Sequence, residues 1–310
     1  MLKHGFFYVI NHGYTTAQTE RIFDIANVPF ACVTAEEKII YAGTIKETGS
    51  YQGYKLKQYW HIDGGVHDHI EHYSINRDVT KRGHPQPLRP FLPEIFRFAR
   101  HNHFEVLHQL LRLFALGLEL PEESLVDLHH FDAAGDTSVR FMKYYPMPPD
   151  DEEKAKNVWL KGHTDIGTVT ILYSQPVSGL QILTRSGAWK WVKHVEVINV
   201  GDSLEFLSGG FYKATIHRVR QPPEDQRQAT RLGVFYFSMS NDNVRLAALA
   251  DSPVLKRVGI KRYFEDDAAP TMEMWRKERT ARYGRSELKL SSEKGVEEEI
   301  IADVVVKHFS

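Results

Sequence analysis

The part of the chain that begins at residue 138 consists of short β-prone runs, and this pattern restricts the possible fold more than any other feature. Most of the runs are separated by Gly, Pro, Asn or Asp, at the spacing that is typical of an all-β sandwich or barrel. The runs are Val139–Tyr145, Thr168–Tyr173, Leu180–Leu183, Trp189–Val192, Val195–Val200, Ser203–Leu207, Ala214–Val219 and Arg231–Ser238. The sequence therefore predicts a mainly β core for this part of the chain.

Helices are predicted before this core. Thr15 or Thr16 can cap a first helix, and apolar residues recur at helical spacing from Pro93 to Leu118. Residues 43–90 lie between these two segments and have weak periodicity, which predicts loop with short helical or extended pieces. A β-prone run at Phe6–Ile10 precedes the first helix and ends at a turn signal.

Helical character returns after the core. Residues 255–285 are helical and charged, and the tail from Ser291 is acidic and then apolar, which predicts a surface helix. The fold class is therefore α+β, as one compact unit. The expected regions are 1–137 as a helical and loop region packed on the barrel, 138–250 as the β core and 251–310 as a C-terminal helical region.

Composition limits the classes of partner. The net charge of −1 over 310 residues gives no global electrostatic reason to expect a nucleic acid or an anionic membrane as a partner. Cys32 is the single cysteine, so no internal disulfide is possible, which fits a reducing compartment. The first residues do not match a signal peptide, and no apolar stretch is long enough to cross a bilayer. We therefore expect a cytoplasmic protein, and its oligomeric state stays open.

A metal site is predicted from three residues of the β region. His163 and Asp165 form an H-x-D pair, and side chains two residues apart in extended chain point to the same face. His217, in a later β-prone run, can complete one triangular face of an octahedron. Two imidazoles and one carboxylate with open positions opposite are typical of non-haem Fe(II) oxygenases.

Chance is the competing explanation, because the chain has 16 histidines and an H-x-D pair is unremarkable alone. His101, His103 and His108 fall in the predicted long helix, and His129-His130 lies near a turn. Packing or solvated polar roles are expected for these five. What distinguishes His163, Asp165 and His217 is their shared position in the β region.

Several segments resemble the isopenicillin N synthase-like family of Fe(II)/2-oxoglutarate dioxygenases. The resemblance covers almost the whole chain, with the motifs in the family's order. The similar segments are Gly5–Gly13, His84–Phe91, Gly162–Leu172, Gly179–Ile182, Gly187–Val192, Asn199–Ser208 and Lys213–Val219. The resemblance implies a distorted double-stranded β-helix, or jelly roll, with flanking helices and an iron centre in its open mouth.

The resemblance also implies the cofactors and the reaction. Fe(II) would be held by His163, Asp165 and His217, with 2-oxoglutarate and O₂ as co-substrates. Arg231 would anchor a carboxylate of 2-oxoglutarate, as a guanidinium can do in bidentate fashion, and Tyr145 would help to hold it. The family oxidises C–H bonds by hydroxylation, desaturation or rearrangement, so a small organic molecule of secondary metabolism is the expected substrate.

The chain departs from the family pattern in four places. Gly233 occupies the serine position of the family's Arg-x-Ser, so one hydroxyl contact to the co-substrate is missing. Lys143 stands where many plant members carry asparagine. The loop Gln221–Thr230 is longer than in many members, and the sequence begins almost at the family's G-F-F motif.

Aromatic residues of the loop region are candidates for a lid over the iron mouth. They are Tyr51, Tyr54, Tyr59, Trp60, His72 and Tyr73. A lid of this kind would suit a small, partly apolar substrate, although the same residues could simply pack the N-terminal helices against the barrel. Phe264 and the helices of residues 255–285 could close the other side.

Three alternative functions stay open from the sequence. The first is an iron oxidase that uses no keto acid. Arg231 argues against this function, and Gly233, which replaces the family's serine, argues for it. The second is a jelly-roll zinc hydrolase, since zinc also accepts two histidines and a carboxylate, but no extra carboxylate is evident as a general base. The third is a non-catalytic jelly-roll metal-binding protein, which the intact set of candidate residues disfavours.

Overall fold

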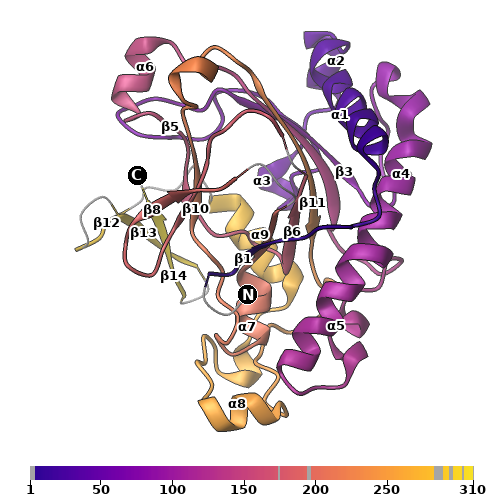
Figure 1. Cartoon of the computed structure of the whole chain (residues 1–310), viewed down its shortest axis with the longest axis vertical. Coiled ribbons are helices and arrows are strands. Elements are labelled where there is room, and N and C mark those ends of the chain that lie inside the picture. Colours follow the sequence, from indigo (N-terminus) through magenta and orange to yellow (C-terminus); the bar gives the residue numbers. More distant parts are fainter. Residues whose placement is uncertain are drawn as a thin grey trace.

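Two antiparallel β-sheets pack face to face and form the core of the fold, with helices on the outer side of one of them (Figure 1). The computed structural model describes residues 4–173, 175–193, 197–282, 289–292, 296–301 and 304–309. Within these residues each sheet has seven strands. The arrangement confirms the predicted jelly roll with flanking helices.

The first sheet carries the helices. Its strands run in the order β1-β9-β6-β11-β4-β3-β2. Their bounds are β1 Phe6–Tyr8, β9 Val197–Val200, β6 Val169–Leu172, β11 Arg231–Ser238, β4 Ser138–Tyr144, β3 Ile70–Asn76 and β2 Gly53–Lys55. Strand β3 lies in the segment predicted as loop with short extended pieces, yet all seven of its residues are buried.

The helices α1 (Thr16–Ala31), α4 (Leu92–His101) and α5 (His108–Gly117) lie along the outer face of this sheet (Figure 1). Thr15 caps α1 as predicted, since its hydroxyl accepts from the Gln18 backbone N–H and the Gln18 side chain accepts in return. Among the described residues, no helix combines the length and the apolar content that crossing a bilayer requires. The other α-helices are α2 Ala35–Ile40, α3 Ile45–Thr48, α6 Pro149–Lys154, α7 Asp202–Leu207, α8 Pro253–Val258 and α9 Met272–Arg282.

The second sheet runs in the order β12-β13-β14-β5-β10-β7-β8. Its bounds are β12 Lys289–Leu290, β13 Val296–Ile301, β14 Val304–Phe309, β5 Val158–His163, β10 His217–Arg220, β7 Leu180–Leu183 and β8 Trp189–Trp191. The predicted surface helix after Ser291 is therefore wrong. The tail is rich in β-branched residues, and β13 and β14 pair with each other before Phe309 joins the sheet opposite Gly162.

A second correction concerns Ser203–Leu207, which was predicted as a β-prone run and forms helix α7. Gly201 precedes the helix with extended backbone. Leu204 and Leu207 are buried, and three residues apart they fall on one face of a helix. Short apolar runs do not distinguish a buried strand from a buried helix, which explains the error.

Two buried histidines tie the helical layer to the first sheet. One ring nitrogen of His103 lies 2.9 Å from the Tyr236 hydroxyl, and the other lies 2.8 Å from the His129 carbonyl oxygen. The His129 ring donates to the Leu125 carbonyl and lies 2.8 Å from the Thr168 hydroxyl. Burial lowers the pKa of His103 to about 3 and that of His129 to about 4. Both rings are therefore neutral at pH 7.

These histidines predict a loss of stability in acid. The unfolded chain takes up protons near pH 6.5 while the folded chain does not, so stability is complete above pH 6.5 and falls as the pH decreases toward about 4. Each ring should account for a few kcal/mol of the free energy of unfolding that is lost in acid, on the order of 1.4 kcal/mol per pKa unit. Urea unfolding between pH 7.5 and 5 should show a smaller pH slope in His129→Gln. The exposed His61→Gln should keep the wild-type slope, and equal slopes in all three proteins would contradict the prediction.

Candidate metal centre

A pocket opens between the two sheets and is lined from both of them. Its empty space is about 920 Å³, part of which is open to solvent. All three predicted metal ligands line it, and so does Arg231. The pocket therefore brings together residues that are 68 positions apart in the sequence, from His163 to Arg231.

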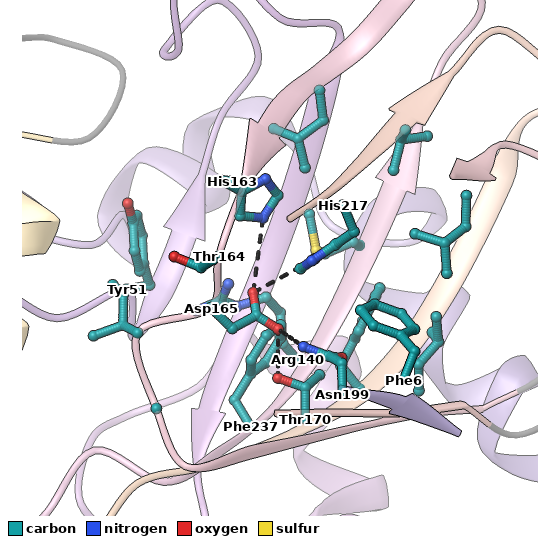
Figure 2. A pocket seen from close by; sticks show the side chains of 18 of the residues that line it. Phe6, Tyr51, Arg140, His163, Thr164, Asp165, Thr170, Asn199, His217 and Phe237 are labelled. Atoms are coloured by element: carbon teal, nitrogen blue, oxygen red, sulfur yellow. Dashed lines mark hydrogen bonds and ion pairs between the residues drawn. The ribbon is translucent and has the colours of Figure 1, made fainter. Parts of the chain in front are cut away.

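His163 and His217 lie side by side because their strands pair. They are direct partners in the register of β5 and β10, and their ring centroids are 4.5 Å apart. Asp165 follows β5 by two residues, and its Oδ1 lies 3.7 Å from Nε2 of each histidine. Figure 2 shows both imidazoles directed at this carboxylate. The H-x-D spacing and the strand pairing together place one oxygen and two nitrogens around a common point.

Hydrogen bonds fix the orientation of all three ligands. Nδ1 of His163 donates to the Lys161 carbonyl at 2.7 Å, and Nδ1 of His217 donates to the Thr215 carbonyl at 3.0 Å. A proton on Nδ1 leaves the lone pair on Nε2, the nitrogen that faces Asp165. This is the tautomer that a metal ligand requires.

The second oxygen of Asp165 is held separately. Oδ2 accepts from the Thr170 hydroxyl at 2.6 Å and from the Asn199 amide at 2.7 Å, which leaves Oδ1 for the imidazole side (Figure 2). Burial raises the pKa of Asp165, but the histidines and these hydrogen bonds outweigh it and hold the pKa below its ordinary value. Burial and the neighbouring His217 lower the pKa of His163. The set is therefore a carboxylate with a neutral imidazole beside it.

Asn199→Ala should weaken metal binding without removing a ligand. Loss of the amide leaves Oδ2 of Asp165 with the Thr170 hydroxyl alone, so the carboxylate can rotate. Losing an outer partner of a ligand typically costs about 10- to 100-fold in metal affinity. A competition titration against a chelator would measure this change. Asn241→Ala, which removes an amide from an unrelated loop, is the control, and an unchanged affinity in Asn199→Ala would contradict the role.

This donor set fits Fe(II). Two imidazoles and one carboxylate on one side, with pocket space opposite, match the two-histidine, one-carboxylate arrangement that leaves coordination positions open. Zinc accepts the same ligands. The described residues that line the pocket include no carboxylate other than Asp165, so a general base for a zinc hydrolase is not found among them.

Arg231 also lines the pocket and is the first residue of β11. It is 3% exposed, and its Nε has no hydrogen-bond acceptor among the described residues. With the Gln175 amide oriented to suit both groups, the Gln175 oxygen accepts from Nη2 at 2.7 Å. A buried guanidinium that lines a pocket and has a spare donor is suited to the carboxylate of a ligand.

Tyr145 does not line this pocket. Its hydroxyl donates to Glu71 at 2.7 Å, and Lys57 and Lys143 lie close to its ring. The preceding residue, Tyr144, is the direct register partner of Arg231 and lines the pocket. The guanidinium carbon of Arg231 is 5.1 Å from the centre of the Tyr144 ring.

The local packing explains why residue 233 is a glycine. A Cβ atom at this position would lie 2.5 Å from the Phe235 ring, whose edge covers the glycine. Phe235 in turn stacks on Phe237, with centroids 5.4 Å apart and an angle of 18° between the rings. The aromatic ring therefore takes the space into which the family's serine side chain would extend.

Gly233→Ser should force the Phe235 ring toward the pocket and disrupt its stacking on Phe237. Overpacking of this kind typically costs about 1–3 kcal/mol, which chemical denaturation can measure. The double variant Gly233→Ser with Phe235→Leu should recover part of the loss, because leucine frees the space. A single variant as stable as wild type would show that the ring moves without cost.

The C-terminal region contributes one pocket residue that the sequence did not indicate. Arg279 of α9 is fully buried and donates to the Thr164 carbonyl at 3.1 Å, between the two ligands of the H-x-D pair. Its charge is balanced by Asp202 at 3.3 Å and Glu299 at 3.8 Å. Helix α9 and strand β13 thus support the metal loop from behind.

The aromatic lid is smaller than predicted. Tyr51 and Trp60 line the pocket, with ring centroids 6.0 Å apart, and His72 is buried behind them. Tyr54 and Tyr73 instead pack in the core beneath the helices. Phe264 packs against Phe206 and Trp275 and does not line the pocket. A different residue, Arg140, lies in the pocket beside Asp165 and was not identified from the sequence (Figure 2).

Comparison with known families gives matches over both parts of the chain. Residues 137–240 match the 2OG-Fe(II) oxygenase superfamily, and these residues include the three candidate metal ligands and Arg231. Residues 1–93 match the N-terminal region described as that of a non-haem dioxygenase in morphine synthesis.

Individual proteins agree with these family matches. The chain is 29% identical to scopoletin 8-hydroxylase of Arabidopsis thaliana over 268 residues, which are 84% of this chain and 69% of that protein. It is 33% identical to the 2-oxoglutarate-dependent dioxygenase iboH of Amanita muscaria over 160 residues, 49% of this chain and 74% of that protein. The structure of a Neurospora crassa protein in complex with alpha-KG and thymine has a TM-score of 0.74 at 22% identity, over 90% of this chain and 87% of that chain. The chain therefore belongs to the 2OG-Fe(II) oxygenases, enzymes that depend on Fe(II), 2-oxoglutarate and O₂.

Proposed function

We propose that this chain oxidises a C–H bond of a small, largely apolar organic molecule in the pocket between its two sheets. His163, Asp165 and His217 hold Fe(II), and Arg231 with Tyr144 holds the far carboxylate of 2-oxoglutarate. The observation that carries the proposal is the position of a buried arginine with a spare donor in the same pocket as the three oriented ligands. We assign the tyrosine that helps to hold 2-oxoglutarate to Tyr144 in place of Tyr145, because the register of β4 and β11 pairs Tyr144 with Arg231.

The protein contributes binding, orientation and exclusion of water. When bound, Fe(II), 2-oxoglutarate and O₂ supply the oxidation, in which the keto acid becomes succinate and CO₂ while the substrate is oxidised. The hydrogen bonds from Nδ1 to the Lys161 and Thr215 carbonyls hold both imidazoles with Nε2 directed at the metal position. The apolar residues around Arg231 keep water from the keto acid, so its carboxylate pairs with the guanidinium in a low-dielectric setting. These are Met142, Leu160, Leu172, Leu180, Val219 and Phe235.

Secondary metabolism is the proposed context, because the pocket lining is mainly apolar and aromatic, as small-molecule sites are. Hydroxylation, desaturation and rearrangement all fit the same metal site. The cytoplasmic location and the lack of nucleic-acid and membrane partners stay predictions from the composition.

An anaerobic titration tests the proposal. Purified protein receives Fe(II) and then 2-oxoglutarate, and the readout is the weak visible charge-transfer band of a keto acid chelated to Fe(II). The band should appear at one equivalent of each, and succinate should form when O₂ is admitted. Iron binding without the band would favour the oxidase that uses no keto acid, the alternative that Gly233 supports. No iron binding would overturn the metal assignment.

A further inference from the structure

A second arginine, half-buried, faces the same pocket, at a distance from the proposed keto-acid end. Arg140 lies on β4 four residues before Tyr144, and its register partners are Phe235 and Ser74. A strand rises about 3.3 Å per residue, so the Cα atoms of Arg140 and Tyr144 are roughly 13 Å apart. Arg140 and Arg231 therefore serve different parts of the pocket.

The Arg140 guanidinium is fixed in place by a hydrogen bond and two rings. Its Nε donates to the Ser74 hydroxyl at 2.7 Å. Its guanidinium carbon lies 4.9 Å from the centre of the Tyr51 ring and 4.3 Å from the centre of the Phe237 ring. Its terminal nitrogens have no protein acceptor among the described residues, and the side chain lines the pocket (Figure 2). An arginine held between rings is preorganised to present its donors to a ligand.

Arg140 also lacks an acidic partner. Among the described residues, no carboxylate oxygen lies within 4.0 Å of an Arg140 side-chain nitrogen, the distance that defines an ion pair. Arg279, the third arginine of the pocket, is paired with Asp202 and Glu299. Two acids lie in the electrostatic surroundings of Arg140: Asp165 is the candidate metal ligand, and Asp136 is occupied by hydrogen bonds from Ser50 and Gln52. A partly desolvated charge without a counter-charge in direct contact is destabilising, and a ligand that supplies this contact offsets the cost.

The bound cofactors leave this charge unbalanced. On the proposed function, the positive charges of Fe(II) and Arg231 are cancelled by Asp165 and the two carboxylates of 2-oxoglutarate. Arg140 then stays as the uncompensated cation beside the position of the reacting substrate. The aromatic surroundings of Tyr51, Trp60 and Phe237 favour a flat, apolar body for the group that brings the negative charge.

We propose that Arg140, Tyr51 and Phe237 form a subsite for the carboxylate of an aromatic acid, which is the substrate class of this enzyme. The planar fork of the guanidinium matches a carboxylate in bidentate geometry, and Trp60 contacts the ring of the acid. The inference rests on the proposed function for its claim about the substrate, while the anion subsite itself can be tested without turnover.

The test is a ¹⁹F NMR titration with two probes of one shape, 4-fluorobenzoate and the neutral 4-fluorobenzamide. The protein is loaded with Zn(II) in place of Fe(II) and with 2-oxoglutarate, so no reaction occurs. Wild type should bind the benzoate about tenfold or more tightly than the benzamide, as expected for a charge-assisted hydrogen-bonded pair. Arg140→Gln should reduce the benzoate affinity to that of the benzamide, and Arg140→Lys should give an intermediate value.

Arg231→Gln, titrated without metal or keto acid, separates this subsite from the proposed cofactor site. Preference for the benzoate should persist in this variant, because Arg140 is intact. Equal affinity of wild type for the two probes would overturn the proposal, and so would an unchanged preference in Arg140→Gln. A preference lost only in Arg231→Gln would also overturn it, since the benzoate would then occupy the keto-acid end. A missing charge-transfer band in the Fe(II) titration, with the benzoate preference intact, would instead reject the proposed function alone.

Discussion

His217→Ala should abolish stable Fe(II) binding, with a fall in affinity well beyond the roughly 100-fold that loss of an outer partner can cause. The variant leaves His163 and Asp165 as a two-ligand remnant, which no longer defines one face of an octahedron. The charge-transfer band should be absent at Fe(II) concentrations that saturate wild type. Succinate formation should fall to the background of free iron.

The control is His61→Ala, which removes an exposed histidine and should leave iron binding at the wild-type level. His217 also packs edge-on against Phe6, with ring centroids 5.4 Å apart, so thermal unfolding of the metal-free proteins must be compared. A His217→Ala protein that is folded and still gives the full band would place the metal elsewhere in the chain.

The grouping of the three candidate metal ligands was predictable because its signal is local or nearly so. The H-x-D spacing puts two ligands on one face, and a third histidine in a β-prone run needs only one strand pairing to join them. That pairing sets His217 directly opposite His163. The resemblance to the family added Arg231, which the structure places in the same pocket.

The choice between Tyr144 and Tyr145 could not be made from the sequence. Neighbouring residues in a strand point to opposite faces, so one step in register moves the whole set of side chains to the other side. The pairing of β4 with β11 places Tyr144 toward Arg231 and leaves Tyr145 with Glu71. Arg140 was missed for the same reason, since its place in the pocket depends on this register.

Tertiary context also decided the elements that were mispredicted. Strand β3 contains Glu71, His72 and Asn76, which weaken its β-prone pattern, yet each of these polar residues is buried in the fold. The tail after residue 291 mixes acidic and apolar residues in a way that fits a helix or a strand. Its strands become stable because β14 joins the edge of the second sheet at β5.

Arg231→Gln should raise the concentration of 2-oxoglutarate needed for half-maximal band formation by about 30-fold or more. Removing one partner of a buried, hydrogen-bonded charge pair typically costs about 2–5 kcal/mol, and about 1.4 kcal/mol corresponds to a tenfold change. Fe(II) binding without 2-oxoglutarate should be unchanged, because Arg231 does not touch the three ligands. Arg231→Lys keeps the charge but loses the planar fork, so its affinity should be intermediate.

The exposed Arg97→Gln serves as the matched control and should bind 2-oxoglutarate like wild type. The decisive comparison is with Arg140→Gln in the same titration. If Arg231 anchors the keto acid, Arg140→Gln leaves the band midpoint close to that of wild type, because the two guanidiniums serve different parts of the pocket. If instead Arg140→Gln raises the 2-oxoglutarate concentration at half-maximal band formation and Arg231→Gln does not, the keto acid extends toward Arg140. The subsite assigned here to an aromatic acid would then hold the co-substrate, and Arg231 would be the one that faces the substrate.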